Sequence, residues 1–353
     1  MKVLKKTKLF RCLKRILIIL LGVVFLLIIA FIVLLGDELR TLNSLRKETP
    51  QYMYSMTYYA DYHFDEFLQE GYKSDEDMER FIVSNITHGF ITEIEKVPGM
   101  CSSFICRNEK GEVLFGRNFD YTFSPVTMLT TAPKDGFRCI TAADIAFAGY
   151  NKNNLPSERG ISTKNFALLS APYLTTDGMN EYGVAMSILD CGRANPPVIE
   201  GAPTLNTSTA VRMVLEYART VDEGIELMKK YNFDLGTKPN HFMMADSSGR
   251  SVVIEFYNGE LVVVDSPLVT NFDLYDERHF GGGIDRYNKI EATLEENNGV
   301  LGEDEALRLL SSVCVPDKKQ YSVLYNLSTG EVTAFTGGDC SVTESFLFDL
   351  VKE

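Results

Sequence analysis

The chain has 353 residues, of which 45% are hydrophobic, so it can bury one large core or two modest ones. Its 48 acidic side chains exceed its 35 basic ones, which gives a formal net charge of −13. Because nucleic acids are bound through a basic surface, this balance argues against a nucleic-acid partner.

The N-terminal residues differ from the rest of the chain. Residues 1–15 carry seven basic side chains and no acidic one, and the twenty residues Ile16–Leu35 then carry no charge. As a helix, such a run spans about 30 Å, the thickness of bilayer hydrocarbon. We therefore expect a cytoplasmic basic segment (1–15), a transmembrane anchor (16–36) and an extracellular remainder, which makes the protein a single-pass membrane protein.

Two other structures fit this apolar run less well. A cleaved secretory signal has a shorter apolar run and ends in small residues, whereas Leu34-Leu35-Gly36-Asp37 follows here. A buried helix of a soluble protein is normally apolar on one face, and this run is apolar on all of them.

The segment after the anchor is polar and has helical features. Ser74-Asp75-Glu76-Asp77 offers a capped helix start. Val97-Pro98-Gly99-Met100 then interrupts the pattern. We expect residues 37–100 to form a helical unit, separate from a domain that covers residues 101–353.

Cys101 begins a predicted β-hairpin. A turn at Asn108–Gly111 follows the first strand, and the second strand ends in Arg117 and Asp120. A thiol, a guanidinium and a carboxylate thus meet at one end of the hairpin, which is a suitable set for acyl transfer through a thioester. Cysteine is more often a core residue, and this is the interpretation we give to Cys106, on the opposite face of the strand.

The rest of the chain alternates strands with helices. The pattern predicts strands at 241–246, 251–258, 261–265, 321–325 and 331–335, and helices at 209–217, 221–231 and 303–313. Runs of strands with separate helices predict an α+β architecture.

Four landmarks occur in order along the chain. They are Cys101 with Gly116-Arg117-Asn118-Phe119-Asp120, Asn180-Glu181-Tyr182-Gly183 leading to Asp190, Thr270-Asn271, and Arg286 at a helix start. Over about residues 98–350 this order resembles the choloylglycine hydrolases, the penicillin V acylases and their acid-ceramidase-like relatives, which are N-terminal-nucleophile hydrolases. The resemblance implies a four-layer αββα sandwich as the catalytic domain.

The resemblance also implies roles at the nucleophile. The Cys101 thiolate would attack the carbonyl of an acyl amide, with its own free α-amino group as the base. Arg117 would hold the Cys101 main chain and favour the thiolate, since a nearby cation lowers a thiol pKa. Asp120 would accept a hydrogen bond from the α-amino group.

The remaining residues would serve the oxyanion and the charge balance. By the same resemblance, the Asn271 side-chain amide and the Asp190 backbone N–H would donate to the oxyanion, and Arg286 would complete the charge network. The sequence departs from the family at Asp190, where Asn or Tyr is common.

A second departure is the position of Cys101 inside the chain, where its nitrogen is an amide and cannot act as a base. Activity would therefore require cleavage of the Met100–Cys101 bond, which acid-ceramidase-like relatives carry out on themselves. Pro98-Gly99 could hold that bond in a strained turn. Residues 37–100 would then be a pro-region or a retained small subunit.

The resemblance implies hydrolysis of linear amides, with a small-molecule N-acyl amide as substrate. Bile-salt conjugates, penicillin V-type amides, fatty-acyl amides and acyl-homoserine lactones all remain open. An acyltransferase of the same fold and a non-catalytic, membrane-anchored binding module are the alternatives. We expect no cofactor, and no metal because the four histidines are scattered along the chain. The sequence leaves a homo-oligomer open.

Overall fold

The structure is a computed structural model. It describes residues 2–49, 51–71, 73–87, 89, 100–121, 123, 125–236, 238–316 and 321–351, and within these ranges not the side chains of residues 2–12, 27, 28, 30–32 and 75. Pro98 and Gly99, the expected strained turn, lie outside the described residues.

The larger of two main sheets has nine strands. Its neighbours are antiparallel except for the parallel pair β2–β5. In spatial order the strands are β1 (Arg46–Lys47), β2 (Met53–Tyr58), β5 (Val126–Thr131), β6 (Cys139–Asp144), β7 (Thr175–Asn180), β8 (Ala185–Asp190), β11 (Asn240–Ala245), β12 (Ser251–Tyr257) and β13 (Glu260–Asp265).

The smaller main sheet has six antiparallel strands. Their order is β14 (Leu268–Val269), β3 (Met100–Arg107), β4 (Val113–Asp120), β17 (Tyr321–Asn326), β18 (Glu331–Thr336) and β19 (Glu344–Leu347). Two short ladders complete the strands: β9 (Thr204–Asn206) with β10 (Asn232–Asp234), and β15 (Asn271–Phe272) with β16 (Gly281–Gly282).

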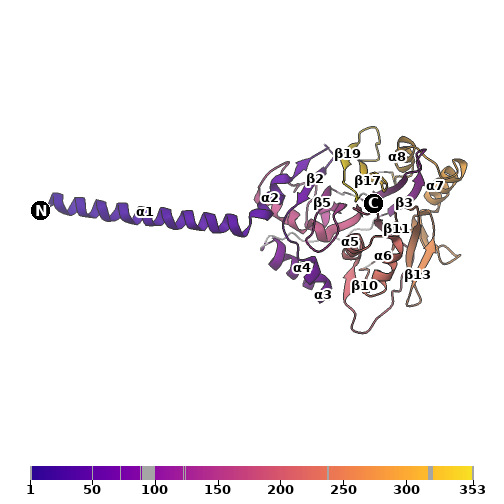
Figure 1. The fold of residues 1–353 in the computed structure, drawn as a ribbon, viewed down its shortest axis with the longest axis horizontal. Coiled ribbons are helices and arrows are strands. Elements are labelled where there is room, and N and C mark those ends of the chain that lie inside the picture. Colours follow the sequence, from indigo (N-terminus) through magenta and orange to yellow (C-terminus); the bar gives the residue numbers. More distant parts are fainter. Residues whose placement is uncertain are drawn as a thin grey trace.

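Helices cover the outer faces of both sheets (Figure 1). On the larger sheet lie α5 (Thr207–Tyr217), α6 (Val221–Met228) and the 3₁₀ segments η2 (Ile145–Ala148) and η3 (Thr163–Leu174). On the smaller sheet lie α7 (Ile284–Glu296) and α8 (Glu303–Ser312). Before Cys101 the chain also forms α1 (Lys2–Leu34), α2 (Gly36–Ser44), α3 (Phe64–Glu70), α4 (Asp75–Ile82) and the π-helical turn η1 (Val83–Thr87).

Three buried clusters show the layering. One fills the space between the larger sheet and its helices, a second lies between the two sheets, and a third lies between the smaller sheet and α7 and α8. Helices, sheet, sheet and helices therefore stack as four layers, and the expected α+β αββα sandwich is confirmed. The strands and helices expected between residues 209 and 335 are present, with ends that differ by a few residues.

The hairpin at Cys101 folds as expected. Strands β3 and β4 pair antiparallel, with Cys101 opposite Phe119 and Ser103 opposite Arg117. Alternation along the strands directs Cys101 into the cluster between the sheets and Cys106 into the cluster under α7 and α8. Cys106 is thus a packing residue.

The segment before Cys101 differs from the expected helical unit. It contains α2, α3 and α4, with the Ser74 side chain capping α4 as predicted, but also strand β2. Tyr54, Met56 and Tyr58 alternate along β2 and pack on the helix side of the larger sheet. This period of two is a strand signal, and it places part of residues 37–87 inside the sandwich.

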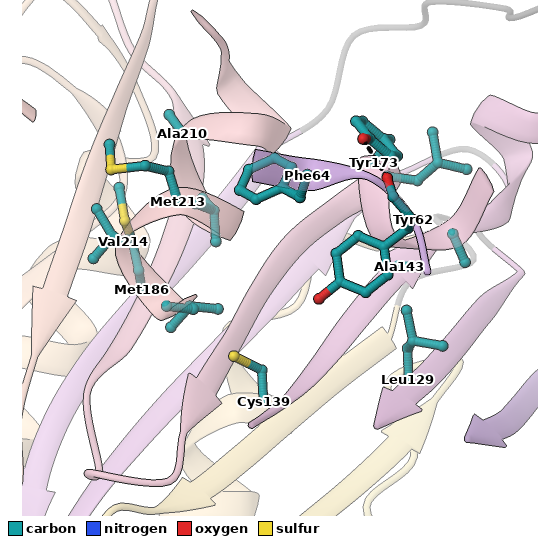
Figure 2. Packing of buried hydrophobic residues seen from close by; sticks show 14 of the residues in the cluster. Tyr62, Phe64, Leu129, Cys139, Ala143, Tyr173, Met186, Ala210, Met213 and Val214 are labelled. Atoms are coloured by element: carbon teal, nitrogen blue, oxygen red, sulfur yellow. Dashed lines mark hydrogen bonds between the residues drawn. The ribbon is translucent and has the colours of Figure 1, made fainter. Parts of the chain in front are cut away.

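Aromatic side chains attach this segment to the rest of the sandwich. Tyr62 donates to Glu216 Oε1 at 2.6 Å. The Tyr173 hydroxyl donates to the Tyr62 carbonyl at 2.6 Å, as Figure 2 shows among their apolar neighbours. Glu216 is fully buried and also accepts from Arg212 at 3.4 Å. Burial raises the pKa of Glu216 to about 7. The hydrogen bond from the Tyr62 hydroxyl opposes this rise, because it stabilises the ionised carboxylate.

Replacing Tyr62 by Phe should lower the free energy of unfolding by about 1–3 kcal/mol, because Glu216 loses a buried donor. Denaturant unfolding followed by circular dichroism measures this change. Tyr59, whose side chain is 40% exposed, provides the matched control, since Tyr59→Phe should change stability by less than about 0.5 kcal/mol. Equal effects of the two substitutions would contradict the importance of the Tyr62 contact.

Helix α1 extends away from the body and includes both the basic segment and the expected anchor (Figure 1). Within the described part of the chain, no helix combines the length and the apolarity required of a membrane span.

Candidate active site

The main chain of Cys101 is held from both sides. Its N–H donates to Asn271 Oδ1 at 2.7 Å, and its carbonyl accepts from Arg286 Nη1 at 2.8 Å. Arg286 Nη2 also donates to Asn271 Oδ1, at 2.7 Å. Three residues that are far apart in the sequence are therefore joined at one point, at the start of β3.

Asn271 links the two sheets at this point. Its Nδ2 donates to the backbone carbonyl of Asp190, the last residue of β8, at 2.8 Å. The expected oxyanion donor thus has a partner in the intact chain. It would have to exchange the Asp190 carbonyl for the substrate oxyanion during a reaction.

Arg286 reaches the site from the first turn of α7. The residue before that helix, Gly283, has a φ of +82°, and a Cβ there would lie 2.5 Å from Arg286 Nη2. Only glycine meets both conditions, because other residues rarely adopt this φ and would displace the guanidinium. Arg286 Nη1 also lies 3.4 Å from Asp120 Oδ2.

Arg117 and Asp120 lie on opposite faces of β4. Asp120 shares the face of Asn118, whose side chain donates to the Leu310 carbonyl of α8, while Arg117 faces the space between the sheets. The two side chains therefore approach Cys101 from different layers of the sandwich.

In the intact chain the backbone N–H of Cys101 donates to Asn271 Oδ1, and the role expected of Asp120, which concerns the free α-amino group of a cut chain, stays a prediction. The arrangement corrects one expected role, because Arg286, and not Arg117, holds the Cys101 main chain. The sequence could not separate the roles of the two arginines, because they depend on the face of the sheet from which each side chain comes.

The thiol itself is buried, and burial raises its pKa to about 11. Arg117 lowers this pKa by its charge, while Asp190 and Asp120 raise it. Arg117 therefore favours the thiolate as expected, but desolvation is the largest of these effects, and the pKa of Cys101 rises overall in the intact chain. Cys101 is a protonated thiol at neutral pH.

The Asp190 carboxylate is directed at polar neighbours outside the Cys101 contacts. Its Oδ1 accepts from Asn240 Nδ2 at 3.0 Å, and its Oδ2 lies 3.6 Å from Lys238 Nζ. The Asp190 side chain therefore has partners away from Cys101. This agrees with the expected role of Asp190, in which only its backbone N–H faces the oxyanion.

Sequence reasoning missed a buried group between the sheets. Asp177 of β7 is fully buried and lies 3.5 Å from Arg117 Nε. It accepts from the hydroxyls of Tyr321 at 2.8 Å and Tyr325 at 2.7 Å. The available signal was a carboxylate inside an otherwise uncharged strand, three residues before Asn180.

It also missed a histidine behind the site. Buried His241 lies 3.0 Å from Glu255 Oε1 through Nδ1 and 2.9 Å from the Thr270 carbonyl through Nε2. Glu255 in turn accepts from the backbone of Leu274 and Tyr275, at 2.7 and 2.8 Å. The pair therefore ties the segment that carries Asn271 to the larger sheet.

Comparison with known proteins identifies the family. The family model described as linear amide C–N hydrolases, choloylglycine hydrolase family, matches residues 101–300, more than half of the chain. The chain belongs to the choloylglycine hydrolase family. The match starts at Cys101, the first residue of the predicted catalytic domain.

Two curated proteins are similar to this member of the choloylglycine hydrolase family over part of their length. A penicillin V acylase of Pectobacterium atrosepticum is 30% identical over 119 residues, which are 30% of this chain and 32% of the acylase. A bile salt hydrolase/transferase of Clostridium perfringens is 27% identical over 194 residues, 50% of this chain and 55% of that protein. The matches thus span about a third and about half of these relatives.

Two solved structures also match over much of the chain. A mutant of the conjugated bile acid hydrolase from Clostridium perfringens has a TM-score of 0.49 and 16% identity, over 71% of this chain and 93% of that one. A penicillin V acylase from Agrobacterium tumefaciens has a TM-score of 0.41 and 15% identity, over 67% and 83%.

Proposed function

We propose that this protein hydrolyses linear amide bonds of N-acyl compounds, with Cys101 as an N-terminal nucleophile. One observation carries the proposal: Asn271 and Arg286 fix the nitrogen and the carbonyl of Cys101, in a chain whose family match begins at that residue. Fixing both ends of one residue positions its thiol for attack.

The chemistry starts with hydrolysis of the Met100–Cys101 bond, which frees the Cys101 α-amino group. This amine, with an ordinary pKa of roughly 7.7–8.0, accepts the thiol proton as sulfur attacks the acyl carbonyl. Asn271 Nδ2 stabilises the oxyanion, and the protonated α-amine passes the proton to the leaving amine. Water then hydrolyses the thioester, which releases the carboxylic acid and regenerates the thiol.

Cleavage is testable directly. N-terminal sequencing or mass spectrometry of the purified active protein should find a new terminus at Cys101, and the Cys101→Ala chain should remain intact. An intact chain with full activity would refute the amine as the base. Met100 begins β3 and is 40% exposed, so that residue is not enclosed in the core.

The segment 37–100 would remain bound after cleavage as a small subunit. Strand β2 pairs with β5, and Tyr62 binds Glu216 across the would-be subunit boundary. Native mass spectrometry should then give the mass of both pieces together, while a denaturing gel separates them. Recovery of residues 101–353 alone under native conditions would make the segment a discarded pro-region instead.

The substrate should be an N-acyl amide with an apolar acyl group. Incubation with bile-salt conjugates, phenoxyacetyl amides, fatty-acyl amides and acyl-homoserine lactones, followed by detection of the released amine or lactone, identifies the class. Cys101→Ala provides the background rate. A chain that stays uncut before Cys101, hydrolyses none of these compounds and does not react with an acyl-alkyne probe would be a binding module.

Acyl transfer is the second candidate activity. The similar Clostridium perfringens protein is named a hydrolase/transferase, and a thioester can pass its acyl group to an amine as well as to water. Adding glycine, taurine or a longer amine to the assay should then yield the new N-acyl amine. Release of the free acid alone, at all amine concentrations, would leave only hydrolysis.

We also propose that residues 16–36 anchor the enzyme on a membrane, with the catalytic body outside. Support comes from the uncharged sequence and from exposed apolar side chains on α1, such as Ile16, Leu17 and Phe25. The full chain should sediment with membranes and resist alkaline carbonate, and protease added outside intact cells should digest the body. A chain found in the aqueous supernatant would contradict the anchor.

A further inference from the structure

The carboxylate of Asp177 is the centre of a buried network beside the nucleophile. Asp177 and Arg117 both have no exposed surface, and their side chains form an ion pair between the two sheets. The hydroxyls of Tyr321 and Tyr325 each donate to one carboxylate oxygen, and Thr176 Oγ1 contributes a third contact at 3.1 Å. Such a carboxylate is fixed in place from several sides.

Arg117 connects this network to Cys101. The two side chains lie on the same face of the β3–β4 hairpin in diagonal positions, since Cys101 is opposite Phe119 and Ser103 is opposite Arg117. The guanidinium also donates to the Ile188 carbonyl of β8. Arg117 is thus held between an anion, a carbonyl and the thiol.

We propose that Asp177 is a positioning residue that fixes Arg117 against Cys101 and neutralises part of its charge, which keeps the nucleophile a thiol until a substrate is attacked. This inference rests on the proposed function, because it assigns the thiol proton to the α-amine at the moment of attack. A guanidinium without its counter-ion would stabilise a free thiolate instead.

The other charges around the thiol do not provide this neutralisation. Asp120 lies on the opposite face of β4 beside Arg286, and Asp190 lies beside Lys238. Both raise the pKa of Cys101 from outside the pair, whereas Asp177 is the carboxylate in contact with Arg117. Charge removal at Asp177 therefore acts mainly on the cation next to the nucleophile.

The experiment measures the rate of Cys101 alkylation by iodoacetamide in the full chain, as a function of pH, by mass spectrometry of the peptide that contains Cys101. Peptides that begin at Cys101 and peptides that include Met100 are counted separately, so that cut and intact chains are compared like with like. No amide hydrolysis is needed for this measurement.

Asp177→Asn should alkylate about three- to tenfold faster than the wild type near neutral pH. A fall of one unit in thiol pKa gives about tenfold more thiolate, and the lower nucleophilicity of a less basic thiolate reduces the gain in rate to about threefold. A merely structural role would change stability without shifting the pH profile. An unchanged or slower rate in folded Asp177→Asn would overturn the inference.

The chain contains a matched control. Arg212, Glu216 and Tyr62 form a second buried network of an arginine, a carboxylate and a tyrosine, beside Cys139 on the helix side of the larger sheet. Glu216→Gln removes an equally buried counter-ion and should leave the Cys101 profile unchanged. An acceleration of Cys101 equal to that in Asp177→Asn would show a general loosening, which overturns the inference.

A second pair of variants, Arg117→Gln with and without Asp177→Asn, keeps the test decisive if Asp177→Asn alone does not fold. Arg117→Gln should slow Cys101 alkylation, and adding Asp177→Asn to it should then change the rate by less than about twofold, because the cation through which Asp177 acts is absent. A threefold or larger rise from the single to the double variant would show that Asp177 acts on the thiol without Arg117, which overturns the inference. A wild type that hydrolyses no amide would refute the proposed function but would leave this comparison valid.

Discussion

Replacing Cys101 by Ala should lower kcat/KM for amide hydrolysis at least about a thousandfold, because the variant can form no thioester. The same variant should stay uncut between Met100 and Cys101 if its own thiol performs the cleavage. Released amine and the mass of the chain are the two measurements.

Cys106→Ala is the matched control for this loss. Cys106 lies in the same strand, five residues away, and packs under α7 and α8 on the opposite face. Its removal should lower stability and leave kcat/KM within about twofold of the wild type. Comparable losses in both variants would indicate damage to the hairpin, and full activity of Cys101→Ala would disprove the nucleophile.

Asn271→Ala should lower kcat by about a hundred- to a thousandfold, the usual effect of removing one oxyanion donor. In the proposed mechanism Asn271 Nδ2 leaves its partner, the Asp190 carbonyl, only when the oxyanion forms. The fall should therefore be larger in kcat than the change in KM. Steady-state kinetics on the preferred acyl amide separate the two parameters.

Asn180→Ala provides the comparison. Asn180 is also buried, and its Nδ2 donates to the carbonyls of Leu215 and Ala218, at 2.9 and 2.7 Å, in the layer of α5. Its loss should reduce stability while kcat is retained. If Asn271→Ala reduced only the folded fraction, as Asn180→Ala does, then Asn271 would be structural.

The sequence predicted the hairpin at Cys101 because a strand pattern, a turn and a second strand are all local. It predicted the strands and helices after residue 209 for the same reason. It did not predict β2, since the alternation of Tyr54, Met56 and Tyr58 lay in a segment dominated by helical features. Local patterns thus predicted most of the strands and helices, but not which strands pair with one another.

At the candidate site, order along the chain brought Asn271, Arg286 and Cys101 together correctly. The main-chain contact expected of Arg117 is made by Arg286, because the partner of a guanidinium depends on sheet register and on the layer it comes from. Asp177 was missed because an isolated carboxylate in a strand has no motif. Asp177 belongs to a network only through its hydrogen bonds from Tyr321 and Tyr325, which are more than 140 positions away in the sequence.

Strand β2 has a practical consequence for producing this protein. It is encoded before Cys101, yet it occupies an interior position of the larger sheet, between β1 and β5. A recombinant product truncated to start at Cys101 would therefore have β5 as an exposed edge strand, and its unpaired backbone N–H and C=O groups would favour aggregation. Expression plasmids for this protein should encode residues 37–100 as well, and any maturation should be left to the folded polypeptide.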